Sequence, residues 1–185
     1  MSSKKTLINL FHPDLEHSRG NRALLDAVRD LPNVTVRDLY REYPDFKIDV
    51  AREQELLINH DVIVFQHPIF WLSGPALLKQ WQDTVLQKGF AFPPGHGDKL
   101  AGKLWQSVVT TGGPAEGYTR EGPFQADFED ILIPFRLTAQ YSSMLWQPPF
   151  TVCSVMPEDA PGMRAITGEE LREKAAAYRS LLEAF

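Results

Sequence analysis

The sequence predicts a doubly wound α/β domain, in which helices cover both faces of a parallel sheet. Short runs rich in β-branched and aromatic residues alternate with longer helical runs along the chain, and such alternation implies right-handed βαβ crossovers. Two strand-like runs, 61–67 and 103–112, have the composition of buried parallel strands and end abruptly in loops suited to a flat ligand. The chain has 185 residues, enough for one well-filled core. We therefore expect residues 1–185 to form a single domain.

The expected elements follow one another without a linker or a repeat. Strands are predicted at 6–11, 33–39, 61–67, 103–112 and 143–155. Helices are predicted at 21–31, 51–60, 75–89, from 124 to about 140, and at 168–185. Pro75 suits a first helical position and Gly89 suits a helix end. Five strands with helices between them fit the flavodoxin-like doubly wound fold better than the six-stranded dinucleotide fold.

Composition excludes several classes of function. The net charge of −5 gives no broad basic field, so we expect no nucleic-acid partner. Cys153 is the only cysteine, which rules out an internal disulfide and favours a reducing cytoplasm. The longest apolar stretch, 62–72, falls far short of the roughly 20 residues of a membrane-spanning helix. The histidines lack the HExxH spacing, so we expect no metal.

A phosphate seat is predicted after the first strand, formed by His12, Ser18, Gly20 and Asn21. Residues just before a helix offer free backbone N–H groups at the positive end of the helix dipole, here with a hydroxyl and an amide beside them. The GxGxxG and GxxxxGK[ST] motifs of the common nucleotide sites are absent, so the expected anion is a flavin phosphate. The alternative is that Ser18 and Asn21 only cap the helix and that His12 is a surface turn residue.

The third strand ends in an aromatic turn, which we define as Pro68, Ile69, Phe70, Trp71 and Leu72. A rigid turn can expose backbone N–H groups to one edge of an isoalloxazine, while a large flat side chain packs beside the ring. Trp71 is the strongest single contact predicted here. The alternative is that Trp71 belongs to the hydrophobic core, as most aromatic residues after a buried strand do.

The fourth strand ends in a glycine loop, which we define as Thr110, Thr111, Gly112 and Gly113. Two glycines allow the backbone to approach a ligand closely, and their N–H groups suit negative charge on a reduced ring. Tyr118 lies six residues past Gly112 and is predicted to bring a hydroxyl to the same ring edge; the alternative is a solvent-facing loop tyrosine. Both loops are expected on one edge of the sheet.

Four segments carry a resemblance to a known family: residues 12–25, 38–54, 62–92 and 100–113. The third, VIVFQHPIFWLSGPALLKQWQDTVLQKGFAF, is long and detailed. The chain resembles the flavodoxin-fold NAD(P)H:quinone oxidoreductases, in particular the bacterial ancillary oxidoreductases of glutathione-gated potassium efflux antiporters. The part after residue 113 matches mainly in pattern.

The resemblance implies a homodimer with FMN or FAD in each subunit. It further implies a ping-pong cycle, in which hydride passes from NADH or NADPH to flavin N5 and then to a quinone. FMN is expected rather than FAD, because the chain ends at Phe185 without the C-terminal extension that longer relatives use around the dinucleotide half. A partner subunit is expected to bury two apolar segments, Tyr43 to Phe46 and Phe90 to Phe92.

By position, the resemblance assigns the phosphate seat to the flavin phosphate, with His12 reaching the ribityl region. It places the aromatic turn beside N5 and O4, the glycine loop at the pyrimidine edge, and Tyr118 near the stacking site of nicotinamide and quinone. One departure concerns proton transfer: Pro123-Phe124 stand where several animal relatives have a histidine, so that role is not carried over.

Two other functions stay open at this point. The first is a regulatory ancillary subunit that binds and activates a potassium efflux antiporter, which would place the protein peripherally at the inner membrane. The second is a flavodoxin-type one-electron carrier, which is disfavoured because such carriers have a compact Ser/Thr-rich phosphate loop and His12 to Asn21 is longer.

Overall fold

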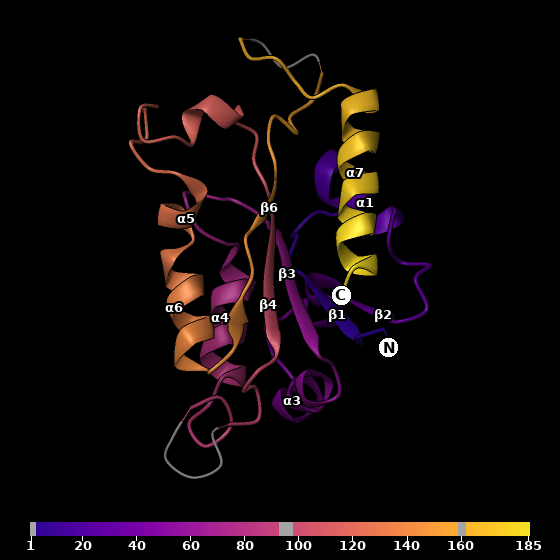
Figure 1. Cartoon of the computed structure of the whole chain (residues 1–185), viewed down its shortest axis with the longest axis vertical. Helices are drawn as coiled ribbons and strands as arrows, with labels where there is room; N and C mark the ends of the chain where they lie inside the picture. The colour runs from indigo at the N-terminus through magenta and orange to yellow at the C-terminus, as the bar shows by residue number, and fades with distance from the viewer. Residues whose placement is uncertain (1–2, 93–97, 159–161) are drawn as a thin grey trace.

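The structure, a computed structural model, describes residues 3–92, 98–158 and 162–185. A parallel sheet forms its centre and helices cover both faces, so the predicted flavodoxin-like architecture is confirmed (Figure 1). The strand order is β2-β1-β3-β4-β5, and β6 also pairs with β4. No helix within the described ranges is long and apolar enough to cross a membrane.

The strands lie close to their predicted positions: β1 Thr6–Leu10, β2 Val34–Asp38, β3 Val62–Pro68, β4 Leu104–Thr110, β5 Leu145–Trp146 and β6 Phe150–Val152. Every residue of β1 and β3 is buried, as expected for strands covered on both faces. Pro68 pairs with Thr110 in the parallel register of β3 and β4. Because both strands end there, the aromatic turn and the glycine loop start side by side on one edge of the sheet.

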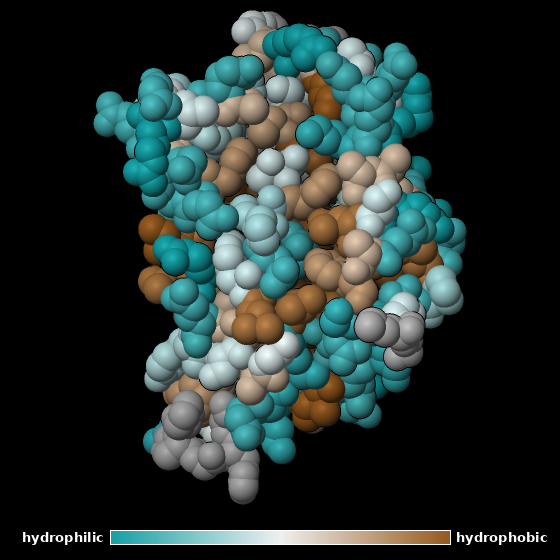
Figure 2. Space-filling view, in the orientation of Figure 1, coloured by the Kyte–Doolittle hydropathy of each residue, from teal (hydrophilic) through white to brown (hydrophobic). Residues whose placement is uncertain are grey.

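The helices form two layers: α1 Arg19–Asp26, α2 Leu39–Glu42, α3 Val50–Ile58, α4 Ala76–Val85, α5 Phe128–Ile131, α6 Ile133–Tyr141 and α7 Gly168–Glu183. One core cluster joins the sheet to α3, α4 and α6, and a second joins it to α1 and α7. Figure 1 shows α7 beside α1, with α4, α5 and α6 across the sheet from them. The face in this view is mostly hydrophilic, and hydrophobic residues gather over its middle, where β6 lies (Figure 2).

Two predicted elements are divided in the structure. The fifth strand, expected over 143–155, becomes β5 and β6, because Pro148 and Pro149 cannot donate to the ladder. Gln106 spans the gap by donating to the carbonyl of Pro148 at 3.0 Å. The helix expected from 124 is replaced by the shorter α5 and α6, which meet at Leu132. Pro134, near the start of α6, has no N–H to continue a single helix.

The two segments expected at a subunit interface are only partly buried within this chain: Tyr43, Phe90 and Ala91 are buried, whereas Phe46 is exposed. Tyr43 and Phe90 are buried, and the Tyr43 hydroxyl donates to Glu53 at 2.8 Å. Phe92 is half-buried and packs against Tyr141, with ring centroids 4.9 Å apart. The core of one chain therefore accounts for Tyr43, Phe90 and Ala91, while Phe46 remains at the surface.

Candidate functional site

A cavity of about 340 Å³ opens at the carboxyl edge of the sheet. It lies within the range of about 300–1,000 Å³ that is typical of small-molecule sites. Its lining combines the three predicted loops with the segment after β6: His12, Asp14, His17, Ser18, Arg19, Pro68, Ile69, Phe70, Thr110, Gly112, Val155 and Met156. The structure thus brings together seven of the predicted site residues.

The phosphate seat is the first turn of α1. Ser18 is the N-cap, and its hydroxyl accepts a hydrogen bond from the amide of Asn21 at 3.3 Å. Gly20 and Asn21 therefore lie inside the helix rather than before it. In helix geometry the amides of Arg19 and Gly20 have no acceptor within the helix, so both are free to donate to an anion at this end of α1, where Arg19 lines the cavity.

Gly20 and Asn21 are buried behind the cavity and do not line it. A Cβ at Gly20 would lie 2.8 Å from Cγ1 of Val155 and 3.2 Å from Cγ2 of Thr110. The side-chain amide of Asn21 donates to the hydroxyl of Thr110 at 2.8 Å. Both residues thus fix the position of the helix turn against β4.

His12 is a neutral hydrogen-bond donor in this structure. Its Nδ1 accepts from the amide of Asp14 at 3.1 Å, which leaves the proton on Nε2. Burial of the ring lowers the pKa of His12, although Asp14 opposes this shift. Nearby, the exposed His17 contacts the carboxylate of Asp14 at 2.8 Å, and this contact raises the pKa of His17.

The aromatic turn is a tight reversal with strained backbone. The amide of Phe70 donates to the carbonyl of Ser73, and the amide of Ser73 donates back. Trp71 and Leu72 between them have φ values of 47° and 59°, which suits a type I′ turn but is costly for residues with side chains. Trp71 is fully exposed. It therefore does not belong to the core.

The turn offers fewer free amides than the sequence suggested. The amide of Ile69 donates to the carbonyl of Thr110 at 2.8 Å, and that of Phe70 is taken by Ser73. Within the described residues, the central amides of Trp71 and Leu72 donate no hydrogen bond. In this turn, the amides of Trp71 and Leu72 are therefore the N–H groups that can donate to the edge of a ring.

His67 supports the turn, although it was not among the predicted site residues. Its Nδ1 donates to the carbonyl of Pro68 at 2.9 Å, while its buried Nε2 has no partner among the described residues. Burial lowers the pKa of His67 to about 4, so the ring is neutral near pH 7. Its ring centroid lies 5.4 Å from that of Phe135 in α6.

The glycine loop is tied to the segment after β6, except at its centre. Thr111 donates its amide to Val152, and Gly113 accepts from the amide of Ser154. A Cβ at Gly112 would meet only Cε of Met156, at 3.9 Å. Gly112 thus faces open space where it lines the cavity, which fits the close approach of a flat ligand.

Tyr118 lies next to this loop but does not line the cavity. A Cβ at Gly113 would be 3.4 Å from its hydroxyl oxygen. The ring is almost completely buried and stacks on Phe128, with centroids 4.6 Å apart. Phe124 also packs on it, with ring centroids 5.3 Å apart. The hydroxyl is therefore held at the edge of the glycine loop.

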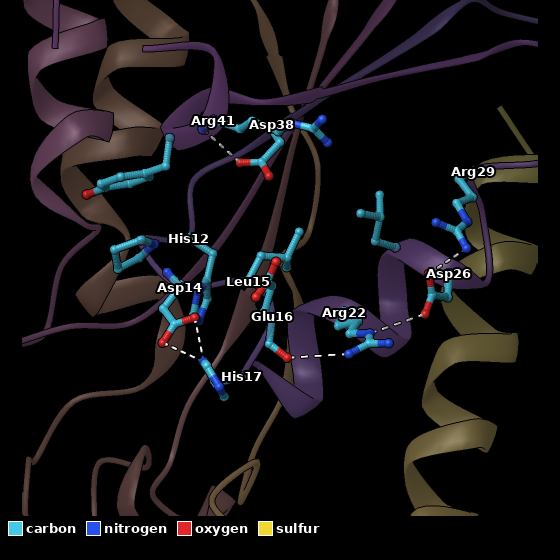
Figure 3. A pocket seen from close by; sticks show the side chains of 13 residues that line it. His12, Asp14, Leu15, Glu16, His17, Arg22, Asp26, Arg29, Asp38 and Arg41 are labelled. Atoms are coloured by element: carbon cyan, nitrogen blue, oxygen red, sulfur yellow. Dashed lines mark hydrogen bonds and ion pairs between the residues drawn. The ribbon is translucent and has the colours of Figure 1, made fainter. Parts of the chain in front are cut away.

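A larger cavity of about 1,070 Å³ adjoins the first beside α1 and the end of β2 (Figure 3). The two cavities share His12, Asp14 and His17. Figure 3 shows its charged side chains mostly paired with one another, as in the contacts of Asp26 with Arg22 and Arg29. Among the described residues, no group of three or more His, Cys, Asp or Glu side chains is arranged to hold a metal ion.

The residues present fit a flavin phosphate and ring. The lining of the cavity includes donors, in the first turn of α1 and at His12, together with the open backbone of Gly112. Five of the lining residues were not among the predicted site residues: Asp14, His17, Arg19, Val155 and Met156. The last two follow β6, far along the chain, and only the pairing of β6 with β4 brings them here.

Known proteins resemble this chain over most of its length. Residues 4–178 match the family described as having a flavodoxin-like fold. The glutathione-regulated potassium-efflux system ancillary protein KefG of Enterobacter sp. (strain 638) is 52% identical over 148 residues, which cover 80% of each protein. The general stress protein 14 of Treponema denticola, solved in complex with FMN, is 39% identical with a TM-score of 0.87 over 97% of this chain and 98% of its own.

Two further solved structures have the same fold but are named for different activities. A protein from Streptomycin violaceusniger titled as a thermophilic tryptophan halogenase is 38% identical, with a TM-score of 0.86 over 97% of this chain and 99% of its own. An NADPH-quinone reductase from P. pentosaceus is 28% identical, with a TM-score of 0.84 over 96% and 97%. Because one fold can carry several activities, the similarity of this chain to these structures identifies its family but not its reaction. The chain belongs to the family of proteins with the flavodoxin-like fold that includes the KefG ancillary proteins.

Proposed function

We propose that this protein is an FMN-dependent NAD(P)H:quinone oxidoreductase. The observation that carries the proposal is the convergence of the first turn of α1, the aromatic turn and the glycine loop on one cavity. The FMN complex of the Treponema denticola relative and the NADPH-quinone reductase relative support the choice of cofactor and reaction. Bound FMN would supply the two-electron transfer between NAD(P)H and a quinone in a ping-pong cycle.

The chain's own residues bind and orient in this proposal. The amides of Arg19 and Gly20 and the Nε2–H of His12 would hold the phosphate. The free amides of Trp71 and Leu72 would donate to the N5 and O4 edge of the ring, and Gly112 would allow the pyrimidine edge to approach the backbone. The Tyr118 hydroxyl donates a hydrogen bond near the stacking site of nicotinamide and quinone. FAD is the alternative cofactor.

We further propose that residues 1–185 form one domain and that two chains form a dimer. With Tyr43 and Phe90 buried within one chain, the exposed apolar residues beside the site are the better interface candidates: Phe70, Trp71, Leu72 and Phe124. A partner there would cover the fully exposed indole of Trp71. The expected compartment is the cytoplasm.

A second function is favoured by the KefG relatives. These relatives are named as ancillary proteins of a glutathione-regulated potassium-efflux system. One of them is 44% identical over 97% of this chain. In that role the protein binds and activates a potassium efflux antiporter at the inner membrane, and its reductase activity is secondary.

Steady-state turnover of several quinones with NADH and with NADPH tests the main proposal. Turnover by the FMN-loaded protein, with parallel lines in double-reciprocal plots, is the expected result. A potassium-efflux assay in cells that carry the antiporter tests the second function. Negligible turnover together with activated efflux would replace the enzyme by the regulatory subunit.

A further inference from the structure

A chain of buried hydrogen bonds runs from α7 to the first turn of α1. The Tyr178 hydroxyl contacts Oε1 of Gln66 at 3.3 Å, and Nε2 of Gln66 donates to the backbone carbonyl of Asn21 at 2.9 Å. The side-chain amide of Asn21 then donates to the Thr110 hydroxyl at 2.8 Å. Four elements, α7, β3, α1 and β4, are joined by these contacts.

The direction of each bond follows from the chemistry of the groups. The backbone carbonyl of Asn21 can only accept, so Nε2 of Gln66 must face it and Oε1 must face Tyr178. Tyr178 therefore donates. Burial raises the pKa of its hydroxyl, which keeps the proton in place. A buried polar group without a hydrogen-bond partner destabilises the folded state. Each group in this chain of hydrogen bonds therefore depends on the presence of its neighbour.

These residues are completely buried, and they end at the proposed phosphate seat. Tyr178, Gln66 and Asn21 all have 0% exposure. The seat tolerates little displacement, because a Cβ at Gly20 would already lie 2.8 Å from Val155. Packing brings α1 close to β4, and the hydrogen bonds of Asn21 set its position along the strand.

We propose that Tyr178 is a positioning residue for the cofactor phosphate. Through Gln66 and Asn21 it holds the first turn of α1 in the position where the amides of Arg19 and Gly20 meet the phosphate. The inference rests on the proposed flavin site and adds to it a requirement for the C-terminal helix, which lies outside the cavity lining.

The test compares two ligands that differ only in the phosphate. The dissociation constants of FMN and of riboflavin are measured by fluorescence quenching for the apoprotein and for Tyr178→Phe. The substitution keeps the ring against Phe150 and removes the donor. We expect the preference for FMN over riboflavin to fall by roughly two- to twelvefold, the range of one net hydrogen bond, with riboflavin affinity unchanged.

Tyr43→Phe is the matched control. Tyr43 is also buried and loses one donated hydrogen bond, to Glu53, but it lies in the other core cluster. The Tyr43→Phe protein should prefer FMN over riboflavin by the same factor as the wild type. If Tyr178→Phe does not fold, the double variant Tyr178→Phe/Gln66→Met removes the Tyr178–Gln66 pair together. It also removes the donor to the carbonyl of Asn21, so a fall at least as large is expected.

The outcomes separate the two claims. A wild type that binds neither ligand would remove the proposed flavin site. A wild type that prefers FMN, together with an unchanged preference in the folded Tyr178 variant or the double variant, would overturn the positioning role while leaving the flavin site intact. An equal fall in Tyr43→Phe would also overturn it, because the effect would then be general destabilisation.

Discussion

The side-chain amide of Asn21 donates to the hydroxyl of Thr110 across 89 residues of sequence, at 2.8 Å. This bond ties the first turn of α1 to the end of β4. The phosphate seat and the glycine loop are therefore parts of one rigid edge rather than two independent loops. The predictions below follow from this edge and from the residues around it.

The released cofactor is predicted to be FMN. The purified protein should be yellow, and chromatography of the supernatant after denaturation should give FMN. The basis is the single phosphate seat at α1 and the FMN complex of a 39% identical relative. FAD as the only flavin would refute this choice, and no flavin after reconstitution would remove the site.

Gly112→Val should abolish tight flavin binding without harming the fold. A Cβ at Gly112 would meet only Met156 Cε, at 3.9 Å, so the branched side chain projects into the cavity rather than into the core. Flavin content and thermal melting of the apoprotein measure the two effects. Wild-type flavin content would show that this loop only turns the chain.

Gly20→Ala is predicted to behave differently. Its Cβ would approach Val155 at 2.8 Å and Thr110 at 3.2 Å, so either α1 or the side chain of Val155 must shift. Overpacking of this kind costs about 1–3 kcal/mol, so a lower melting temperature of the apoprotein should accompany weaker FMN binding. An unchanged melting temperature would contradict the close packing of α1 against β4.

Tyr118→Phe should retain flavin and lower kcat/KM for quinone. The ring keeps its stacking on Phe128, while the hydroxyl beside Gly113 is lost. One hydrogen bond made only in the transition state is worth about 0.5–1.5 kcal/mol, or roughly a two- to twelvefold rate effect. Unchanged kinetics would exclude the proposed role, and antiporter activation, where it exists, should survive this change.

His67 predicts an acid-dependent loss of stability. Its pKa falls from the ordinary 6.5 to about 4 in the folded protein, so the unfolded chain binds the proton first as pH decreases. The free energy of unfolding is therefore highest above pH 6.5. It decreases by about 3 kcal/mol as the pH falls from 6.5 to 4. Urea unfolding of wild type and His67→Gln across this range measures it. Parallel pH profiles would contradict a buried neutral imidazole.

The sequence predicted the sheet well, because runs such as 62–68 have a strong local pattern. It also placed the aromatic turn and the glycine loop on one edge, and the pairing of Pro68 with Thr110 confirms this. Local signals were sufficient for both, since the carboxyl ends of adjacent parallel strands must meet.

Long-range contacts were beyond the sequence. In the sequence, Gln66 and His67 are simply polar residues within an apolar run. In the structure, Gln66 donates to the carbonyl of Asn21 and His67 donates to the carbonyl of Pro68. Arg19 lies between Ser18 and Gly20 of the predicted phosphate seat, but its side chain pairs with Glu158 at 2.7 Å. The direction of such a side chain depends on the segment after β6, which no local pattern places.

The most direct test of the central claim is an anaerobic titration followed by the visible absorption spectrum. The account predicts that the yellow protein is bleached by one equivalent of NADH or NADPH and that one equivalent of a quinone restores its spectrum. A flavin spectrum that neither nicotinamide nucleotide bleaches would contradict the proposed oxidoreductase.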